Sequence, residues 1–200
     1  MLKIHGVARS RAFRCIWAAE EAGLPYEVVP VGFGPTMKEA VAAVNPNGKI
    51  PALLDGTLTL FESLAINLHI AGKAGVPFMP TGDDASRTMQ WTLWAATEAE
   101  PAAMQWAYNT YILPAEQRSA AEAAKGAAAL AARLAVLEGA IAGPYLLGKH
   151  FTVADCNLAG VLYGAWMNGF DMAATPRVKA WLDACFDRPA ALRARAQREG

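Results

Sequence analysis

The stretch that decides the fold is "NPNGKIPALLDGTLTLFES", at residues 45–63. Pro51 opens a short apolar run, and an Asp-Gly pair separates that run from a second one at Leu58–Leu60. An Asp-Gly pair between two such runs is a strong signal for a tight turn between antiparallel strands. The stretch therefore predicts a β-hairpin with strands at Ala52–Asp55 and Leu58–Leu60, followed by a helix that begins at Glu62.

Pro51 sets the first question about function. A proline cannot donate a hydrogen bond to a strand ladder, so Pro51 belongs at the end of an edge strand or in a turn. The Ile50–Pro51 bond is of the one kind with an accessible cis form, and a cis bond would turn the N–H and C=O of Ile50 outward. Those groups could pair with an extended peptide, as an added strand does on a sheet edge. The alternative is an ordinary trans proline in a turn, which composition by itself favours.

The chain before this stretch alternates between strand and helix patterns. Gly23 ends the first helix, as glycine commonly does. The predicted elements are a strand at Leu2–Val7, a helix at Ala12–Ala22, a strand at Tyr26–Val31, a short helix at Met37–Val44 and, after the hairpin, a helix at Glu62–Gly72. The order β-α-β-α-β-β-α predicts an α/β domain at residues 1–75.

The rest of the chain has a different character. Residues 76–84 combine prolines, a glycine and two acids, which is typical of a linker between domains. Strand patterns are absent beyond it, so residues 85–200 are predicted to form an all-α domain. Its predicted helices are Ala85–Ile112, Ala115–Ala142, Val153–Met167, Arg177–Phe186 and Pro189–Gln197.

Two patterns in this helical half indicate folding roles. Thr152 and Asp155 have the spacing of a capping box, in which the two residues satisfy the start of one helix reciprocally. A stripe of apolar residues at helical spacing is explained by core packing. Its members are Leu130, Leu134, Leu137 and Ile141.

Charge and composition exclude several classes of function. Eighteen basic residues balance eighteen acidic ones in 200 residues, so no broad field favours nucleic acid or an anionic membrane. The most apolar later stretch carries Arg133 and Glu138, which argues against a membrane span. The N-terminus has no apolar signal segment, so a cytoplasmic location is expected. The three cysteines and three histidines are scattered, and no metal site is expected.

The ordered set of segments resembles a known family. It comprises "EEAGLPYE" after the first helix, "NPNGKIPALLDG", "ESLAI", the proline-rich linker and "YLLGKHFTVADCNLAG". In this order, the segments resemble the cytosolic glutathione transferases, and the resemblance spans nearly the whole chain. It implies a thioredoxin-like N-terminal domain, an all-α second domain and glutathione as co-substrate, with a homodimer as the assembly and a role in detoxification.

The resemblance also implies a binding role for several residues. Ile50 would bind the cysteinyl backbone of glutathione, with Pro51 cis. Ser63 would lie at a helix N-terminus, where free N–H groups receive the γ-glutamyl carboxylate. Glu62 would bind the γ-glutamyl ammonium, because its own carboxylate would repel the γ-glutamyl carboxylate. The alternative for both residues is an ordinary helix start.

Two further binding residues depend on the same resemblance. Lys49 could meet the glycine carboxylate at the far end of the tripeptide, or could simply be solvated. In related enzymes the γ-glutamyl amine is also contacted across a dimer interface, and Glu98 is the candidate for that contact.

The thiol of glutathione requires activation, because the thiolate is the nucleophile. The donor should lie between the first strand and the first helix, where Ser10 carries the only hydroxyl. Family members use Tyr, Ser or Cys near this place, and this chain has Val7 where some relatives have their serine. Ser10 as a plain helix cap is the competing interpretation, with Arg11 or a backbone N–H then holding the sulfur. Arg9, Arg11 and Arg14 could add positive potential or be solvated.

The electrophile would bind against the helical half, and we select Gln105 and Trp166 as the residues that contact it. The alternative is that such side chains belong to the core, as most apolar residues of a helical bundle do. The expected reaction is addition of the thiolate to a hydrophobic electrophile, with peroxide reduction as a close variant. Two alternatives remain: a noncatalytic protein-interaction module, and a glutathione-dependent isomerase.

Overall fold

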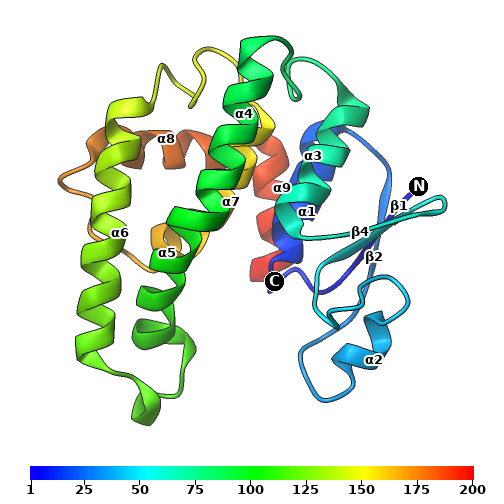
Figure 1. Cartoon of the computed structure of the whole chain (residues 1–200), viewed down its shortest axis with the longest axis horizontal. Helices are drawn as coiled ribbons and strands as arrows, with labels where there is room; N and C mark the ends of the chain where they lie inside the picture. The colour runs from blue at the N-terminus through cyan, green and yellow to red at the C-terminus, as the bar shows by residue number, and fades with distance from the viewer. The chain divides into compact units, whose positions relative to one another are not determined.

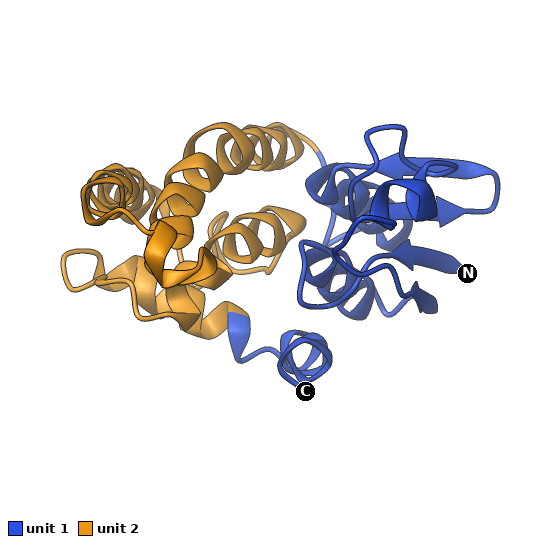
Figure 2. Ribbon diagram, turned by 90° about the horizontal axis from the view of Figure 1, so that it is seen from below, with its two compact units in different colours: residues 1–81, 186–200 blue, residues 82–185 orange.

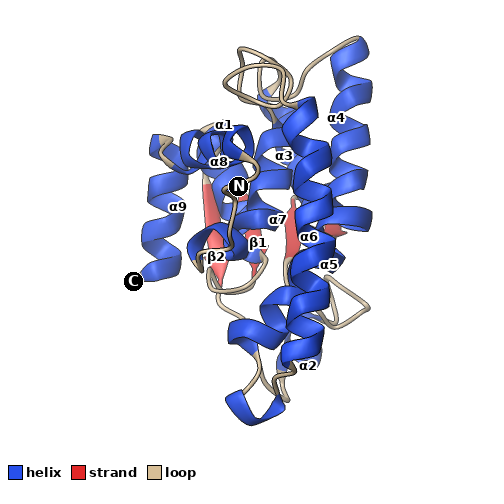
Figure 3. Ribbon diagram, turned by 90° about the vertical axis from the view of Figure 1, so that its left-hand side faces the viewer, coloured by secondary structure: helices blue, strands red, loops and turns tan.

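The computed structural model describes all residues from Met1 to Gly200. The chain forms two compact units, one built from residues 1–81 and 186–200 and the other from residues 82–185 (Figure 2). The first unit contains all the strands, and the second is helical (Figure 3). The predicted fold class, an α/β thioredoxin-like domain followed by an all-α region, is confirmed.

The first unit contains one four-stranded mixed sheet. Its strands are β1 (Leu2–His5), β2 (Tyr26–Val29), β3 (Ala52–Asp55) and β4 (Leu58–Phe61), in the order β2-β1-β3-β4. Strand β1 is parallel to β2 and antiparallel to β3, which is antiparallel to β4. The predicted hairpin is therefore present, and it forms one edge of the sheet.

Helices α1 (Ala12–Ala22) and α3 (Ser63–Ala74) pack against one another in this unit (Figure 1). Helix α2 (Met37–Val41) is one turn long and ends three residues before the predicted bound. Gly23 ends α1 in the left-handed conformation, at φ 62°, as the sequence predicts. The core consists of fully buried apolar side chains from the sheet and these two helices: Ile4, Phe13, Ile16, Trp17, Leu53, Ile66 and Ile70.

Helix α9 (Pro189–Glu199) belongs to the first unit and packs along α1. The structure thus differs from the predicted helical domain at 85–200, which included this last helix. Apolar packing and charge pairing both attach this helix to the first unit. Ala191 and Ala194 of α9 are completely buried, and Arg188 donates two hydrogen bonds to Glu21 on α1, at 2.8 and 2.7 Å. Helical periodicity predicts the helix but carries no information about which helix it packs against.

The second unit is a set of packed helices. They are α4 (Asp83–Trp94), a π-helical turn η1 (Ala95–Ala99), α5 (Glu100–Ala107), a second π-helical turn η2 (Tyr108–Ile112), a 3₁₀ turn η3 (Ala115–Gln117), α6 (Ala120–Ala140), α7 (Val153–Met167) and α8 (Pro176–Phe186). The long helix predicted at 85–112 is therefore continuous but contains two widened turns. Helix α6 begins later than predicted, at a Ser119 cap whose hydroxyl accepts from the Glu122 N–H.

Buried side chains of α6 and α7 form the centre of this unit. The predicted stripe on α6 is buried, with Leu130, Leu134 and Leu137 at most 1 % exposed. Gly126 lies against α5 so closely that a Cβ atom there would be 2.4 Å from the backbone nitrogen of Trp106. No helix of the structure has both the length and the apolar character that a bilayer crossing needs.

Candidate functional site

The segments that the sequence singles out converge at one end of the sheet. In the β3–β4 pair Ala52 is opposite Phe61, and in the β1–β3 pair Ala52 is opposite His5. Residues just before Ala52, just after Phe61 and just after His5 must therefore lie together. These residues are Ile50–Pro51, Glu62–Ser63 and the turn at 6–11 that leads into α1.

Ile50 presents backbone groups at this end of the sheet. The Ile50–Pro51 bond is cis, as predicted. Regular strand pairing starts at Ala52, so Ile50 lies outside the ladder and is partly exposed. An extended peptide could pair with the backbone of Ile50 without displacing a strand.

Asn45 holds the loop before Ile50, a role that the sequence analysis did not assign. Its buried side-chain amide donates to the Lys49 carbonyl at 2.7 Å, and its Oδ1 accepts from the Asn47 N–H at 3.0 Å. Gly48 takes a positive φ of 64° in the same loop. The signal was present in the Asn-Pro-x-Gly pattern, because asparagine side chains bond to nearby backbone in turns. The Lys49 side chain is exposed.

Helix α3 begins in an unusual way. Glu62 directly precedes the helix with φ 69° and ψ 108°, and it is the one non-glycine residue of the chain with positive φ. No side chain caps this helix start. The first N–H groups of a helix have no partners within the helix, and together with the helix dipole they attract an anion. A strained backbone at such a place is typical of ligand sites.

Arg14 adds positive charge beneath this helix start. It is 6 % exposed, and its Nη1 donates to the Ser63 hydroxyl at 3.3 Å. Of the two interpretations given for Arg14, the structure supports added positive potential and excludes simple solvation. Sequence reasoning could not distinguish them, because Ser63 is 49 residues away.

Cys15, the next residue on α1, is not a nucleophile in this arrangement. Its thiol is fully buried and lies 3.7 Å from the Ser63 carbonyl oxygen. Burial raises the pKa of the Cys15 thiol well above its ordinary value. The site therefore contains no activated thiol of its own, and a nucleophilic sulfur would have to come from a ligand.

Ser10 lies in the turn between β1 and α1. Its Oγ donates to the Val7 carbonyl at 2.7 Å and accepts from the Ala12 N–H at 3.1 Å. A Cβ atom built on Gly6 would lie 3.5 Å from the Ile50 Cβ and 3.7 Å from the Ser10 Oγ, so the turn and Ile50 flank the same glycine. The local capping role is thus present, and it is compatible with a second role.

That second role depends on where the Ser10 hydroxyl proton points. The Val7 carbonyl also accepts from the Ser10 backbone N–H at 2.9 Å. The hydroxyl can therefore rotate towards a ligand while the Val7 carbonyl keeps a hydrogen bond. Its acceptor bond from Ala12 leaves the donor function available. Arg11, the alternative group, is exposed at the start of α1.

The candidate residues of the second unit have partners within that unit. Glu98 accepts from Arg133 at 3.1 Å, and Gln105 donates to Glu122 at 2.8 Å. The Trp166 indole N–H donates to Asp183 at 2.8 Å. These bonds join α5 or η1 to α6, and α7 to α8. They describe packing of the helices, and the predicted roles of the three residues in ligand binding stay predictions.

The arrangement in the first unit suits one kind of ligand. It combines backbone groups outside the strand ladder at one end of the sheet, a helix start that attracts a carboxylate, and an acid next to that start. Together these groups can hold an extended peptide whose end carries both an ammonium and a carboxylate. A hydroxyl donor lies in the adjoining turn.

Comparison with known proteins agrees with this description. Residues 2–72 match the family model of the glutathione S-transferase N-terminal domain, and residues 99–189 match that of the C-terminal domain. Glutathione S-transferase 3 of Zea mays is 35% identical over 94% of this chain and 90% of its own length.

Solved structures are similar over almost the whole chain. A theta class glutathione S-transferase from Xanthomonas axonopodis pv. citri, with glutathione bound, has a TM-score of 0.88 and 30% identity, covering 96% of both chains. Glutathione S-transferase I from maize, in complex with an atrazine glutathione conjugate, has a TM-score of 0.88 and 28% identity, covering 99% of this chain and 98% of its own.

Proposed function

This chain belongs to the glutathione S-transferase family, and on that premise we propose that it binds reduced glutathione and adds its thiolate to a hydrophobic electrophile. One observation carries the proposal: Ile50, two residues before β3, and the uncapped start of α3 lie at the same end of the sheet. Relatives with glutathione or a conjugate bound support the choice of ligand.

Glutathione would lie as an extra strand beside Ile50, with its cysteinyl backbone paired to the Ile50 N–H and C=O. The γ-glutamyl carboxylate would accept from the first N–H groups of α3 and from the Ser63 hydroxyl. Glu62 would accept from the γ-glutamyl ammonium. Lys49, which is exposed in the preceding loop, would meet the glycine carboxylate.

Ser10 would stabilise the thiolate. An ordinary thiol has a pKa of about 8.5, and lowering it to about 7 requires ~2 kcal/mol. A helix terminus supplies roughly 0.3 to 1 kcal/mol, and a hydrogen bond to a charged acceptor contributes about 1.5 to 3 kcal/mol. The Ser10 hydroxyl would rotate from the Val7 carbonyl to the sulfur, and the thiol proton would leave to solvent. The thiolate then forms a carbon–sulfur bond and displaces a leaving group, or adds to an activated double bond.

The electrophile would bind against the second unit, with Gln105 and Trp166 as the residues we select. We also propose a homodimer, in which Glu98 contacts the γ-glutamyl amine bound to the other copy. Met89 and Leu93, which are four residues apart on α4, are 43% and 58% exposed, and exposed apolar side chains on one helix support association of copies. Sedimentation of the purified protein tests this part, and a monomer at all concentrations would contradict it.

Two measurements test the function. Calorimetric titration with glutathione should give binding in the micromolar to millimolar range. The absence of both heat and a thermal shift at millimolar glutathione would contradict the proposal that glutathione is the substrate. Ser10→Ala should then lose conjugation of a chlorodinitrobenzene-type substrate while it still binds glutathione. Full activity in Ser10→Ala would remove Ser10 from the mechanism. Binding without conjugation in the unaltered protein would favour a noncatalytic module, and activity only with peroxides or activated double bonds would favour the reductase or isomerase variants.

A further inference from the structure

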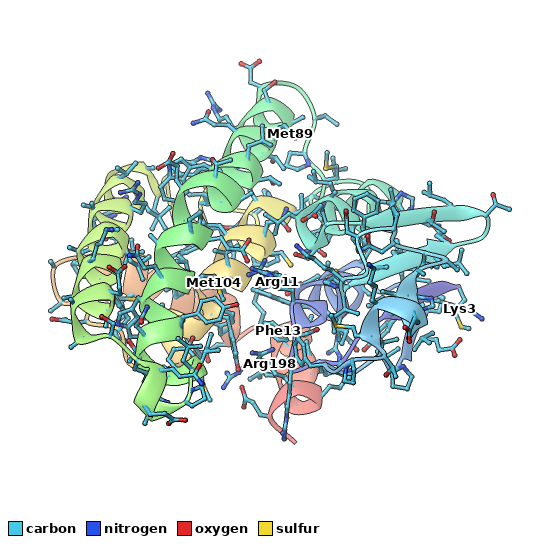
Figure 4. All side chains as sticks on the ribbon, turned by 60° about the horizontal axis from the view of Figure 1, so that its bottom comes forward. Lys3, Arg11, Phe13, Met89, Met104 and Arg198 are labelled. Atoms are coloured by element: carbon cyan, nitrogen blue, oxygen red, sulfur yellow. The ribbon has the colours of Figure 1, made fainter.

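Arg198, in the last turn of α9, reaches the turn that carries Ser10. Its Nη1 donates to the Ala8 carbonyl at 2.7 Å and to the Ser10 carbonyl at 3.1 Å. Its guanidinium carbon also lies 5.4 Å from the centre of the Phe13 ring, and the two side chains are adjacent in Figure 4. One side chain from the end of the chain thus contacts both the turn and the first turn of α1.

Helix α9 holds Arg198 on a rigid support. Arg193 donates to Glu20 on α1 at 2.6 Å, and Gln197 donates to the Tyr26 hydroxyl at 2.7 Å. Tyr26 in turn donates to Glu20 at 2.6 Å. Together with the Arg188–Glu21 pair, these bonds attach α9 to α1 and β2 independently of Arg198.

The turn is held by a small number of hydrogen bonds of its own, which are one backbone bond and the two bonds of the Ser10 hydroxyl. It begins at Gly6, which has a positive φ of 149°, and its backbone is closed by one bond from the Ser10 N–H to the Val7 carbonyl. The Ala8 carbonyl belongs to the Ala8–Arg9 peptide and the Ser10 carbonyl to the Ser10–Arg11 peptide. Bonds to both carbonyls therefore hold the backbone on either side of the Arg9–Ser10 segment that carries the hydroxyl. The Ser10 carbonyl also accepts from the N–H of Phe13, the second residue of α1, at 3.2 Å.

We propose that Arg198 is a positioning residue for thiol activation: by bonding the Ala8 and Ser10 carbonyls, it holds the Ser10 hydroxyl where a bound thiolate needs a donor. The inference rests on the proposed function of Ser10. A planar guanidinium suits this role, because it presents donors in a fixed direction with little freedom. Groups that fix a catalytic side chain act on the rate more than on substrate affinity.

The test uses three variants of the full chain. Arg198→Gln removes the charge and the two-carbonyl contact, and Arg198→Lys keeps the charge. Arg193→Gln is the matched control, since it removes the same charge and one α9–α1 contact without touching the turn. The measurements are the pKa of glutathione's thiol when bound, from the ultraviolet absorbance of the thiolate, and kcat and KM with chlorodinitrobenzene. Hydrogen exchange of the Ala12 and Phe13 amides without ligand and the melting temperature complete the set.

We expect Arg198→Gln to raise the pKa of the bound thiol by about half to one unit and to lower kcat about three- to tenfold. KM for glutathione should stay within about twofold. Exchange at the Ala12 and Phe13 amides should become faster. Arg198→Lys should recover part of the loss, and Arg193→Gln should change only the melting temperature.

Equal thiol pKa values and equal exchange rates in Arg198→Gln and Arg193→Gln would overturn the inference, because a merely structural role of α9 predicts that equality. Failure of the unaltered protein to bind or ionise glutathione is a separate result, which contradicts the proposed function. In that case the amide exchange rates still decide whether Arg198 orders the turn.

Discussion

The starts of α3 and α7 carry similar residues and have opposite surroundings. At α7, Thr152 and Asp155 form the predicted capping box, and the Asp155 carboxylate is completely buried. At α3, Glu62 and Ser63 stand at the helix start, no side chain caps it, and Glu62 is exposed with a positive φ. Each start places an acid and a hydroxyl at unpaired helix N–H groups.

Asp155 explains why the α7 start is structural. Its carboxylate accepts from the Leu146 N–H at 2.7 Å, the Thr152 N–H at 2.9 Å and the Trp181 indole at 2.9 Å. Burial raises the pKa of the Asp155 carboxyl, and these donors oppose that shift. The chain itself thus supplies the anion at α7. At α3 it supplies none, and an anion from outside can take that place.

Asp155→Ala should have the largest effect of the changes that test this contrast. It leaves four buried donors, which are the Leu146 and Thr152 N–H groups, the Thr152 hydroxyl and the Trp181 indole, without this acceptor. We therefore expect the free energy of unfolding to fall by about 3 to 5 kcal/mol. Urea denaturation measures the change, with Asp155→Asn as a control that keeps one acceptor oxygen. Glutathione affinity of the folded protein should not change. A loss below about 1 kcal/mol would contradict the conclusion that Asp155 stabilises the start of α7.

Ser63→Ala should have the next largest effect, and on binding rather than on stability. The lost hydrogen bond to a carboxylate contributes about 1.5 to 3 kcal/mol, which corresponds to roughly a 10- to 100-fold weaker affinity for glutathione. Calorimetry measures it. Thr152→Ala is the matched control, for which we expect about 1 kcal/mol less stability and an unchanged affinity. The same effect of both variants on affinity would refute the distinction between the two helix starts.

Glu62→Gly should separate backbone strain from ligand binding. Glycine adopts positive φ without steric cost, so we expect the free energy of unfolding to rise by about 1 kcal/mol while glutathione binds more weakly. Glu62→Gln controls for the charge, because it keeps the side-chain shape and the positive φ. If both variants had equal stability, the φ of 69° would cost nothing, and the strain argument would fail.

The smallest effect concerns Asp55, the last residue of β3, and its contacts with α3. Asp55 accepts hydrogen bonds from Lys73 and from His69, the latter at 2.9 Å. Both bonds lower the pKa of the Asp55 carboxyl below its ordinary value of 3.8, and the bond from Lys73 has the larger effect. A carboxyl with a lowered folded pKa contributes stability that is present above 3.8 and is lost as the pH falls through the folded value.

Asp55→Asn should therefore reduce stability at neutral pH and make the acid-side loss of stability shallower. Urea midpoints measured at neutral pH and near pH 3, a value chosen from the usual range of carboxyl titration, would show it. Asp84→Asn, which removes a surface pair with Arg87, is the control and should leave the slope unchanged. Parallel curves for Asp55→Asn and the unaltered protein would mean that this carboxylate contributes nothing to acid sensitivity.

Much of the fold follows from signals within a few residues of one another. Gly23 ends α1, Asp55-Gly56 turns the hairpin, and Thr152 with Asp155 begins α7, as predicted. The cis Ile50–Pro51 bond and the helix start after β4 also agree with the prediction. Asn45 also acts locally, through bonds to Asn47 and Lys49, and the Asn-Pro-x-Gly pattern carries that signal. Arg14 is different, because its partner Ser63 is 49 residues away and no local pattern encodes that contact.

Local order along the chain was sufficient to predict the α/β unit, the helical unit and the end of the sheet at which we propose that glutathione binds, because turns, caps and periodicity act over a few residues. Partners of the long charged side chains could not be predicted in this way. Arg198 contacts a carbonyl 188 residues away, and α9 packs on the first unit although it follows the last helix of the second. Such pairings depend on which surfaces meet in the folded chain, and many charged residues of equal propensity compete for each partner.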